Sequence, residues 1–385
     1  MRSHANEDSL VLYIDSIKTF GFRNLENLEF SPNSNINIFI GKNGQGKTNL
    51  LETIYVASKG KSFRPGKIQE WKNQKIDPES PCKLEFKLRD GKHSHHLKII
   101  WGESTKQIFL DEKKVTSGKL LQLFPTILFS PESLLSIKEG PDKRRNLLDE
   151  MLTSSVGTQH FYTQYKKSLK NRNRFLKNSK ESGTFNENLY KSLNILFLNF
   201  STQLTAARVD LLFKLNPHIK KALTLIFGNE LDYEFEYIIS ERHVKNWSPN
   251  EILEFQQLRA KDLRNAELSY GSSLVGAHKH DLKFMLNGKD ARFFSSQGQQ
   301  RGLILAIKMA EVMYRFEQGE KPILLLDDVL SELDFEKREK LYEFLSTFKT
   351  QIFITTTDSI DGVDINGDYF NIKQGHIEPN KRLNF

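Results

Sequence analysis

Eight consecutive residues have the types and the spacing of a loop that binds phosphate groups. They are Gly41, Lys42, Asn43, Gly44, Gln45, Gly46, Lys47 and Thr48, which match the pattern G-x-x-x-x-G-K-T. The glycines let backbone N–H groups turn inward around a β-phosphate, Lys47 can reach the β- and γ-phosphates, and the Thr48 hydroxyl can coordinate Mg²⁺. The residues therefore predict a site for a nucleoside triphosphate with Mg²⁺, with Lys47 as a catalytic residue.

The segments on either side of the loop have the pattern that such a site needs. The apolar run Ile36–Ile40 precedes the loop and predicts a strand, whereas residues 49–55 have the pattern of a helix. The N-terminus of that helix would add partial positive charge facing the phosphates. The alternative is a glycine-rich turn without a ligand, and the strand–loop–helix order disfavours it.

A second apolar segment, residues 323–326, ends in two neighbouring carboxylates, Asp327 and Asp328. In an ATPase with a phosphate loop, such a strand lies beside the strand that leads into the loop. Asp327 would hold Mg²⁺ through its water shell, and Asp328 would orient or deprotonate the attacking water. The alternative is a strand end followed by acidic turn residues, but the presence of the loop favours the catalytic interpretation.

A further candidate for anion binding lies where Ser296, Gly298 and Gln299 precede a helix predicted over residues 302–316. Serine and glycine at a helix N-terminus can bind an anion, although the same residue types are also ordinary helix caps. Because this segment lies only a short stretch before the acidic strand, one copy of the chain is not expected to direct both onto the same phosphate.

The composition is that of a folded protein with two or three lobes. The chain has 385 residues, of which 38% are hydrophobic and 27% charged, and no apolar run approaches the ~20 residues of a membrane span. A single cysteine, Cys82, excludes an internal disulfide and a cysteine zinc site. Residues 1–9 are polar and lack the apolar core of a signal peptide, so a cytoplasmic location is expected. The net charge of +8 is compatible with a polyanionic partner.

Hydrophobic periodicity divides the chain into stretches with different patterns. Residues 11–40 and 83–129 alternate as strands, the latter in an antiparallel region. Residues 141–270 have helical spacing in separate, short helices, with one strand-like run at 233–239 and no heptad repeat that persists.

After residue 270 strands return and then alternate with helices. A hairpin is predicted around Asn287 and Gly288, with strands over 282–286 and 291–294. The following segments favour a buried parallel sheet, with helices over 302–316 and 336–348 and strands over 323–326 and 351–355.

The fold class is therefore α/β, with an ATPase head built from both ends of the chain and an inserted, mainly helical arm. The head is expected to have a mixed sheet and an antiparallel β region. The predicted divisions are a polar extension (1–11), the first part of the head (12–140), the arm (141–270) and the second part of the head (271–385).

Together these motifs resemble those of ABC-type ATPases and, more narrowly, those of the RecF family, which is related to the SMC ATPases. The resemblance extends from about residue 12 to the C-terminus, and its most specific pair is SQGQQR with LDDVLSELD. The stretches that carry it are residues 22–25, 41–52, 60–64, 129–132, 144–149, 286–291, 296–301 and 326–334.

The resemblance implies a composite site formed by two copies of the chain. Each ATP with its Mg²⁺ would lie between residues 41–48 of one copy and residues 296–299 of the other. Ser296 and the N–H group of Gly298 would contact the γ-phosphate across the interface. Binding of ATP would join the two heads and hydrolysis would release them, so that the homodimer depends on ATP and a slow ATPase acts as a switch.

The resemblance also assigns five residues outside these two segments. Ser331 and Asp334 would lie along the seam between the two copies. Arg23, Asn24 and Arg64 would flank the phosphates or communicate with DNA. For each of these three the alternative is an ordinary surface charge or loop residue.

The function that the resemblance implies is ATP-dependent DNA binding in recombinational repair and replication, as part of the SOS response to DNA damage. The chain would act at gaps or at junctions between single-stranded and double-stranded DNA. There it would help to load recombinase together with mediator proteins of the RecO and RecR types.

The sequence departs from the ABC and RecF patterns at several places. Asp328 stands where most ABC ATPases carry glutamate, a difference that RecF-like chains share, and its shorter side chain predicts slow turnover. Residues 355–358 contain no switch histidine, and residues 130–132 stand in place of a glutamine loop. Residues 276–281 follow the family pattern only loosely, and residues 1–11 have no counterpart in it.

One segment, residues 161–180, is rich in lysine and arginine and contains no aspartate or glutamate. Cations on one helix could neutralise several DNA phosphates without reading the base sequence. The alternative is a solvated helix face, and residues 59–67 are a second basic candidate. The residues predicted to contact DNA are Lys166, Lys167, Lys170, Arg172 and Arg174.

Two other classes of function remain as alternatives. The first is the ATPase subunit of a transporter, which the missing switch histidine and glutamine loop disfavour. The second is a structural SMC-like DNA tether, which the absence of a coiled-coil repeat disfavours. The predicted function involves no membrane.

Overall fold

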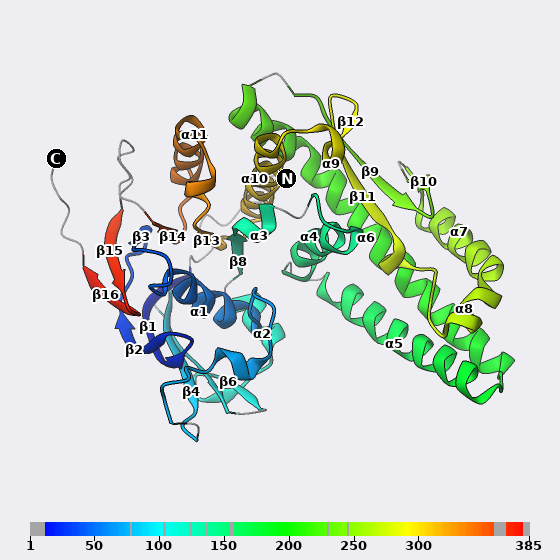
Figure 1. The fold of residues 1–385 in the computed structure, drawn as a ribbon, viewed down its shortest axis with the longest axis horizontal. Coiled ribbons are helices and arrows are strands. Elements are labelled where there is room, and N and C mark those ends of the chain that lie inside the picture. Colours follow the sequence, from blue (N-terminus) through cyan, green and yellow to red (C-terminus); the bar gives the residue numbers. More distant parts are fainter. Residues whose placement is uncertain are drawn as a thin grey trace, which may run out of the picture. The chain divides into compact units, whose positions relative to one another are not determined.

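The computed structural model describes residues 12–77, 79–91, 93–102, 105–123, 125–134, 137–154, 158–228, 231–244, 246–357 and 367–379. They form two compact units (Figure 1). The head unit comprises the described parts of residues 1–132 and 311–385, and the arm unit comprises those of residues 133–310. The polar extension predicted over residues 1–11 lies outside the described residues.

A six-stranded sheet of mainly parallel strands runs through the head unit. Five of its strands pair in parallel and β16 pairs antiparallel to β15. All residues of β13 and β14 are buried, as expected for parallel strands that are covered on both faces. The strand order is β16 (His376–Pro379), β15 (Asp368–Lys373), β3 (Ile36–Ile40), β14 (Ile352–Thr356), β13 (Ile323–Asp327) and β8 (Thr126–Phe129).

A second sheet in the head unit is antiparallel throughout. Its strand β4 alternates buried and partly exposed residues, as a strand with one face toward the core does. The strand order is β2 (Leu25–Phe30), β1 (Leu12–Phe22), β4 (Cys82–Asp90), β5 (His93–Trp101), β6 (Lys106–Leu110) and β7 (Lys113–Lys114).

The helix α1 (Lys47–Lys59) contacts strands of both sheets and is almost entirely buried. One hydrophobic cluster includes Leu50 and Ile54 of α1, Phe39 of β3 and Phe86 of β4. The smaller elements of the head unit are η1 (Ile68–Trp71), α2 (Ser117–Leu123), η4 (Leu330–Glu332) and α11 (Phe335–Ser346). The core of the head therefore fixes both ends of the phosphate loop.

The arm unit combines long helices with a small antiparallel sheet. The sheet order is β10 (Arg242–His243), β9 (Tyr233–Ile239), β11 (Asp281–Leu286) and β12 (Lys289–Asp290). The helices are α4 (Pro141–Ser154), α5 (Gln159–Ser182), α6 (Glu187–Phe227), α7 (Pro249–Asp262), α8 (Arg264–Tyr270), η3 (Ala277–Lys279) and α9 (Ala291–Phe294). The limits between the two units fall within α3 (Pro131–Leu134) and α10 (Gln297–Glu317).

Three predicted elements differ in the structure. The arm helices are not all short, because α6 is a single helix of 41 residues that continues through Pro217. Buried residues on both sides of the proline, among them Leu212 and Ile219, keep that helix in place where one backbone hydrogen bond is lost. Residues 291–294 form the short helix α9 and not a strand, since Asp290 caps it through its side chain. The helix α10 begins at Gln297 and not at residue 302.

The arm unit covers residues 133–310, and these limits differ from those predicted for the arm, 141–270. The strand β11 pairs with β9 along its whole length, so the polypeptide from 271 to 290 belongs with the arm unit. The sequence shows the strand pattern of β11 but contains no local signal for which strand it pairs with.

Candidate nucleotide-binding site

The loop between β3 and α1 has the backbone that a phosphate-binding loop requires. Gly44 and Gly46 have φ angles of 77° and 113°, which side chains disfavour, and Gly46 directly precedes the first turn of α1. Because Gly46 has no side chain, it leaves the first N–H groups of α1 uncapped. These groups and the helix dipole can therefore bind an anion.

The turn between β15 and β16 supports the loop from one side. The N–H groups of Gln374 and Gly375 donate to Gln45, one to its side-chain oxygen at 2.7 Å and one to its carbonyl at 2.8 Å. Gly41 lies so close to β15 that a Cβ atom there would be 2.4 Å from the carbonyl oxygen of Ile372. This support comes from the far end of the chain, and the sequence analysis did not identify it.

Lys47 is buried, and its ammonium group lies inside the loop. Its Nζ atom donates to the carbonyl oxygens of Gly41 and Lys42 at 2.5 and 3.2 Å. The loop residues Lys42 and Asn43 are exposed at its outer edge. The structure therefore brings the predicted loop residues together around one cationic group.

The hydroxyl of Thr48 donates to Oδ1 of Asp327 at 2.8 Å. Asp327 is the last residue of β13 and is buried. A hydroxyl and a carboxylate are hard oxygen donors, and Mg²⁺ prefers one or two such protein ligands with water and phosphate oxygens. These two residues therefore fit a Mg²⁺ ion beside the loop.

Thr355 of β14 connects the two neighbouring aspartates. Its hydroxyl donates to Oδ1 of Asp327 at 2.9 Å and accepts from the N–H group of Asp328 at 3.0 Å. Asp328 has a φ of 49°, a conformation that non-glycine residues rarely adopt and that occurs at functional sites. Ser331 donates to the carbonyl of Asp328 at 2.7 Å. The role of Thr355 was missed because its contacts come from a neighbouring strand.

A buried carboxylate of α1, Glu52, binds three polar side chains from neighbouring segments. Arg23 donates to it through Nε and Nη2 at 3.2 and 2.8 Å, Arg64 lies 3.5 Å from it, and Ser62 donates to it at 2.6 Å. Glu52 was not predicted as a site residue. The available signal in the sequence was an acidic residue within a mostly apolar helical segment. A carboxylate buried in this way requires cationic or hydrogen-bonding partners.

Asn24 links this group of residues to the loop. Its amide nitrogen donates to the carbonyl of Gly44 at 3.2 Å, and its amide oxygen accepts from Asn49 at 2.7 Å. Arg64 in turn donates to Asn49 at 2.8 Å. The three residues that the family resemblance assigned, Arg23, Asn24 and Arg64, therefore lie together beside α1.

The segment 296–299 lies in the arm unit and forms the start of α10. The N–H of Ser296 donates to the side chain of Gln299 at 2.9 Å, and the N–H of Gln299 donates to the Ser296 hydroxyl at 3.2 Å. This reciprocal pair is a capping box. Ser296 and Gly298 are exposed, and a Cβ atom on Gly298 would meet nothing nearer than 3.9 Å among the described residues.

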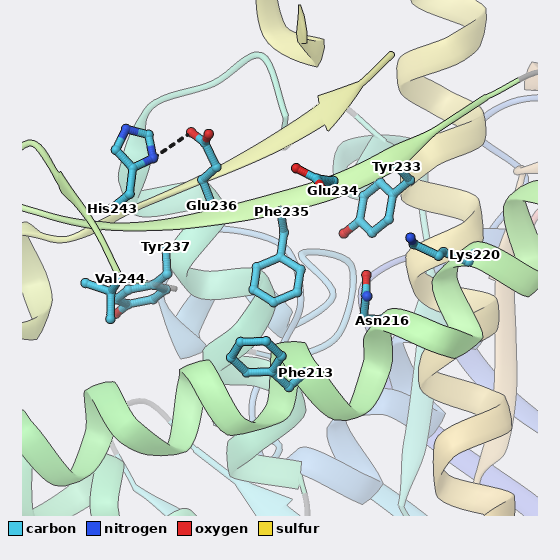
Figure 2. A pocket seen from close by; sticks show the side chains of 10 residues that line it. All are labelled: Phe213, Asn216, Lys220, Tyr233, Glu234, Phe235, Glu236, Tyr237, His243 and Val244. Carbon is cyan, nitrogen blue, oxygen red and sulfur yellow. Dashed lines mark ion pairs between the residues drawn. The ribbon is translucent and has the colours of Figure 1, made fainter. Parts of the chain in front are cut away.

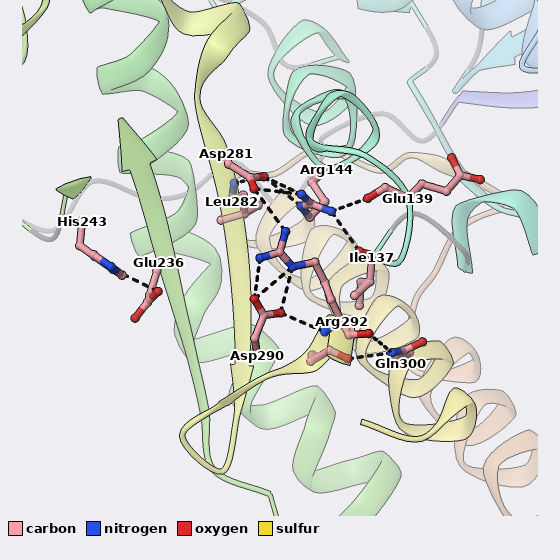
Figure 3. A network of polar contacts seen from close by, with 11 residues as sticks. Ile137, Glu139, Arg144, Glu236, His243, Asp281, Leu282, Asp290, Arg292 and Gln300 are labelled. Carbon is pink, nitrogen blue, oxygen red and sulfur yellow. Dashed lines mark hydrogen bonds and ion pairs between the residues drawn. The ribbon is translucent and has the colours of Figure 1, made fainter. Parts of the chain in front are cut away.

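A chain of polar contacts supports the residues just before this segment (Figure 3). Arg144 is buried and donates to both oxygens of Asp281 at 2.9 Å, and Arg292 lies 3.4 Å from the same carboxylate. Arg292 also pairs with Asp290 at 2.6 Å. The amide of Gln300 donates to the carbonyl of Ala291 at 2.7 Å and bonds two further carbonyls of this turn. The N-terminus of α10 is thus rigidly held within the arm unit.

Four of the five predicted DNA-contacting residues are exposed on α5: Lys166, Lys167, Lys170 and Arg174. The prediction for Arg172 is wrong, because its side chain is fully buried. It pairs with Glu267 at 2.6 Å and donates to Ser273 at 2.7 Å, so it joins α5 to the rest of the arm. Its position on the inner face follows the helical period set by the buried residues Tyr165, Ser168 and Leu176.

The other residues that the sequence analysis singled out lie in other segments. Asp334 caps α11 by accepting from the N–H of Lys337 at 3.0 Å, and the hydrogen bonds from Lys337 lower the pKa of its carboxyl group. His278, in the loosely matching segment 276–281, bonds the hydroxyl of Tyr165 at 2.7 Å, and burial lowers its pKa to about 4. The side chain of Glu132 and residue Asp358 lie outside the described residues.

None of the described helices combines the length and apolar composition that a bilayer crossing requires.

Comparison with known proteins agrees with this fold. The family model described as the RecF/RecN/SMC N-terminal domain matches residues 13–361. The DNA replication and repair protein RecF of Geotalea uraniireducens is 35% identical over 373 residues, which are 94% of this chain and 99% of that protein. The protein of the same name from Citrifermentans bemidjiense is 36% identical over 380 residues, 94% and 98% of the two chains.

Solved structures give the same result. The recombination mediator protein RecF-ATPrS in the RecFOR pathway has a TM-score of 0.86 at 32% identity, covering 97% of this chain and 100% of that one. The Smc head domain of Pyrococcus furiosus has a TM-score of 0.56 at 12% identity, which is a likeness of fold over 96% of each chain.

The sheets, the loop and the acidic strand define a P-loop protein of the SMC-head class. The chain belongs to the RecF/RecN/SMC family, and within that family to the RecF proteins.

Proposed function

We propose that this chain is an ATP-dependent DNA-binding protein of recombinational repair and replication that works in the cytoplasm. Its relatives carry the name DNA replication and repair protein, and a similar solved chain is called a recombination mediator. In this proposal the chain binds gapped or junction DNA, dimerises on ATP and helps mediator proteins of the RecO and RecR types to load recombinase.

The observation that carries the proposal is the contact between Thr48 and Asp327, which joins the loop to the acidic strand at 2.8 Å. When bound, ATP with Mg²⁺ would supply the phosphoryl group that is transferred and would add its own charge to the site. Lys47 would exchange its carbonyl partners for phosphate oxygens. Thr48 and Asp327 would hold the metal ion, and Asp328 would orient the attacking water.

The second half of the site would come from another copy of the chain. Gly298 supports this step, because glycine in a helix costs about 0.5–1 kcal/mol relative to alanine and no described neighbour requires it here. An exposed glycine at a helix N-terminus allows a phosphate on a partner to approach the backbone closely. Gln299, Ser331 and Asp334 would border the same interface.

The replacement Asp328→Asn tests the chemical step. Asparagine tolerates the left-handed backbone at this position, so the variant should fold, but its amide cannot accept the proton of water. We expect hydrolysis, already slow, to fall by about 10²-fold or more, with ATP binding retained and an ATP-bound dimer that persists. An unchanged rate of hydrolysis would remove Asp328 from the mechanism.

A further inference from the structure

A small cavity in the arm unit lies between α6 and β9 (Figure 2). Its volume is about 160 Å³, and a cavity of about 150 Å³ is large enough for one six-membered aromatic ring. Phe213 of α6 and Phe235 of β9 form one wall, with ring centroids 5.3 Å apart in an edge-to-face arrangement. Phe213 remains 44% exposed, so this wall is accessible from solvent.

Two of the residues that line this cavity each carry a buried polar atom that has no hydrogen-bond partner among the described residues. They are the hydroxyl oxygen of Tyr233 and the amide oxygen of Asn216. Tyr233 is only 1% exposed, and burial raises the pKa of its hydroxyl, which therefore stays protonated and can donate. Figure 2 shows both oxygens turned toward the space beside the ring of Phe235.

Leaving such atoms buried without partners is unfavourable, so a ligand or water that satisfies them would be bound favourably. Pro217 has no N–H group and cannot donate to the carbonyl of Phe213, so one backbone hydrogen bond of α6 is missing beside the two lining residues Phe213 and Asn216, although the helix continues.

The charges around the cavity do not favour a polyanion. Lys220 is exposed at one edge, whereas Glu234 and Glu236 lie on the opposite face of β9 from the aromatic rings. Glu236 pairs with His243 at 3.1 Å. One lysine among two carboxylates provides no excess positive charge for a nucleic acid backbone.

We propose that this cavity binds a tyrosine side chain of a partner protein. The aromatic ring would pack on Phe213 and Phe235. Its hydroxyl would donate to Asn216 and accept from Tyr233, which satisfies both unpartnered atoms with one group. Phenylalanine would fill the same space but would leave both atoms unpaired, so the site discriminates between the two rings.

Titration of the full-length protein with two matched probes tests this proposal. The probes are N-acetyl-tyrosinamide and N-acetyl-phenylalaninamide, which differ only in the hydroxyl group, and binding is followed by NMR chemical shifts. We expect the tyrosine probe to bind about tenfold more tightly, the factor that corresponds to a hydrogen-bond contribution of about 1.4 kcal/mol. Thymidine and cytidine serve as probes for a nucleobase.

Two variants locate the effect. Asn216→Leu and Tyr233→Phe should each bring the ratio of the two affinities toward one, and Tyr233→Phe keeps the ring if the first variant fails to fold. Leu225→Ala, at another exposed position of α6, should leave the ratio unchanged. Equal affinity of the two probes, tighter binding of a nucleoside, or no binding of any probe would overturn the proposal; the last result would mean that water fills the cavity.

Discussion

At the scale of single residues, the direction in which Asp327 faces depends on Thr355. The threonine hydroxyl holds the same carboxylate oxygen that Thr48 contacts, and it also fixes the backbone of Asp328. A side chain that orients a metal-binding carboxylate acts on metal affinity without touching the metal itself.

The replacement Thr355→Val preserves the shape of the side chain and removes its hydroxyl. We expect the Mg²⁺ concentration that supports half-maximal hydrolysis to rise by about 10-fold or more, because Asp327 loses a partner that orients it. Thr356→Val, at the next buried position of the same strand, is the matched control. Similar Mg²⁺ dependence in both variants and the wild type would exclude this role for Thr355.

The sequence predicts residues of the site where the chemistry is local. The loop 41–48 and the acidic pair at the end of β13 were predicted because each lies within one short motif. Glu52 and Thr355 were not, because their importance arises from partners on other elements. Arg172 was assigned to the surface since composition alone does not separate the two faces of a helix, and its burial overturned that assignment.

At the scale of elements, the start of α10 contains a glycine that its own fold does not require. We expect Gly298→Ala to raise the free energy of unfolding by about 0.5–1 kcal/mol and to weaken ATP-dependent dimerisation. Chemical denaturation and light scattering measure the two effects.

Gly302→Ala is the matched control on the same helix. Its Cβ atom would lie 2.1 Å from the ring of Phe227, so it should destabilise the arm. Loss of stability in Gly298→Ala would mean that the glycine serves the fold, and unchanged dimerisation would mean that no phosphate approaches it.

The helix α5 has an exposed basic face and a buried polar one. We expect Lys166, Lys167 and Lys170→Glu to weaken binding to gapped DNA and to reduce the salt slope of the binding constant by about 3, one unit for each lost phosphate contact. Fluorescence anisotropy over a range of salt concentrations measures both quantities.

The control reverses three other exposed lysines of the arm, Lys191, Lys221 and Lys261. An equal loss in both triple variants would assign the effect to net charge. Arg172 is left intact, because removing it would strand the buried carboxylate of Glu267 at a cost of about 3–5 kcal/mol.

Elements were predictable where the hydrophobic periodicity is strong. The parallel strands and the helix after the loop follow from their apolar patterns. The continuity of α6 through Pro217 and the pairing of β11 with β9 depend on tertiary contacts that no local pattern in the sequence shows. The short helix α9 replaced a predicted strand because its cap outweighs the β-propensity of two phenylalanines.

At the scale of the whole molecule, we propose that one chain supplies only half of the nucleotide site. The loop, Lys47 and the pair Thr48 and Asp327 would provide contacts for the phosphates and the metal ion from the head unit, while the exposed start of α10 lies in the arm unit with its own support. A second copy that contributes this helix would turn nucleotide binding into assembly, and hydrolysis into release.

The measurement that tests this account most directly is the solution mass by light scattering with and without ATP and Mg²⁺. The account predicts a monomer that doubles its mass with the nucleotide, and a Ser296→Arg variant that binds ATP but stays monomeric, because the added side chain blocks the partner's phosphate. Monomers under all conditions, or doubling that Ser296→Arg leaves unchanged, would contradict the composite site and reduce residues 296–299 to a helix cap.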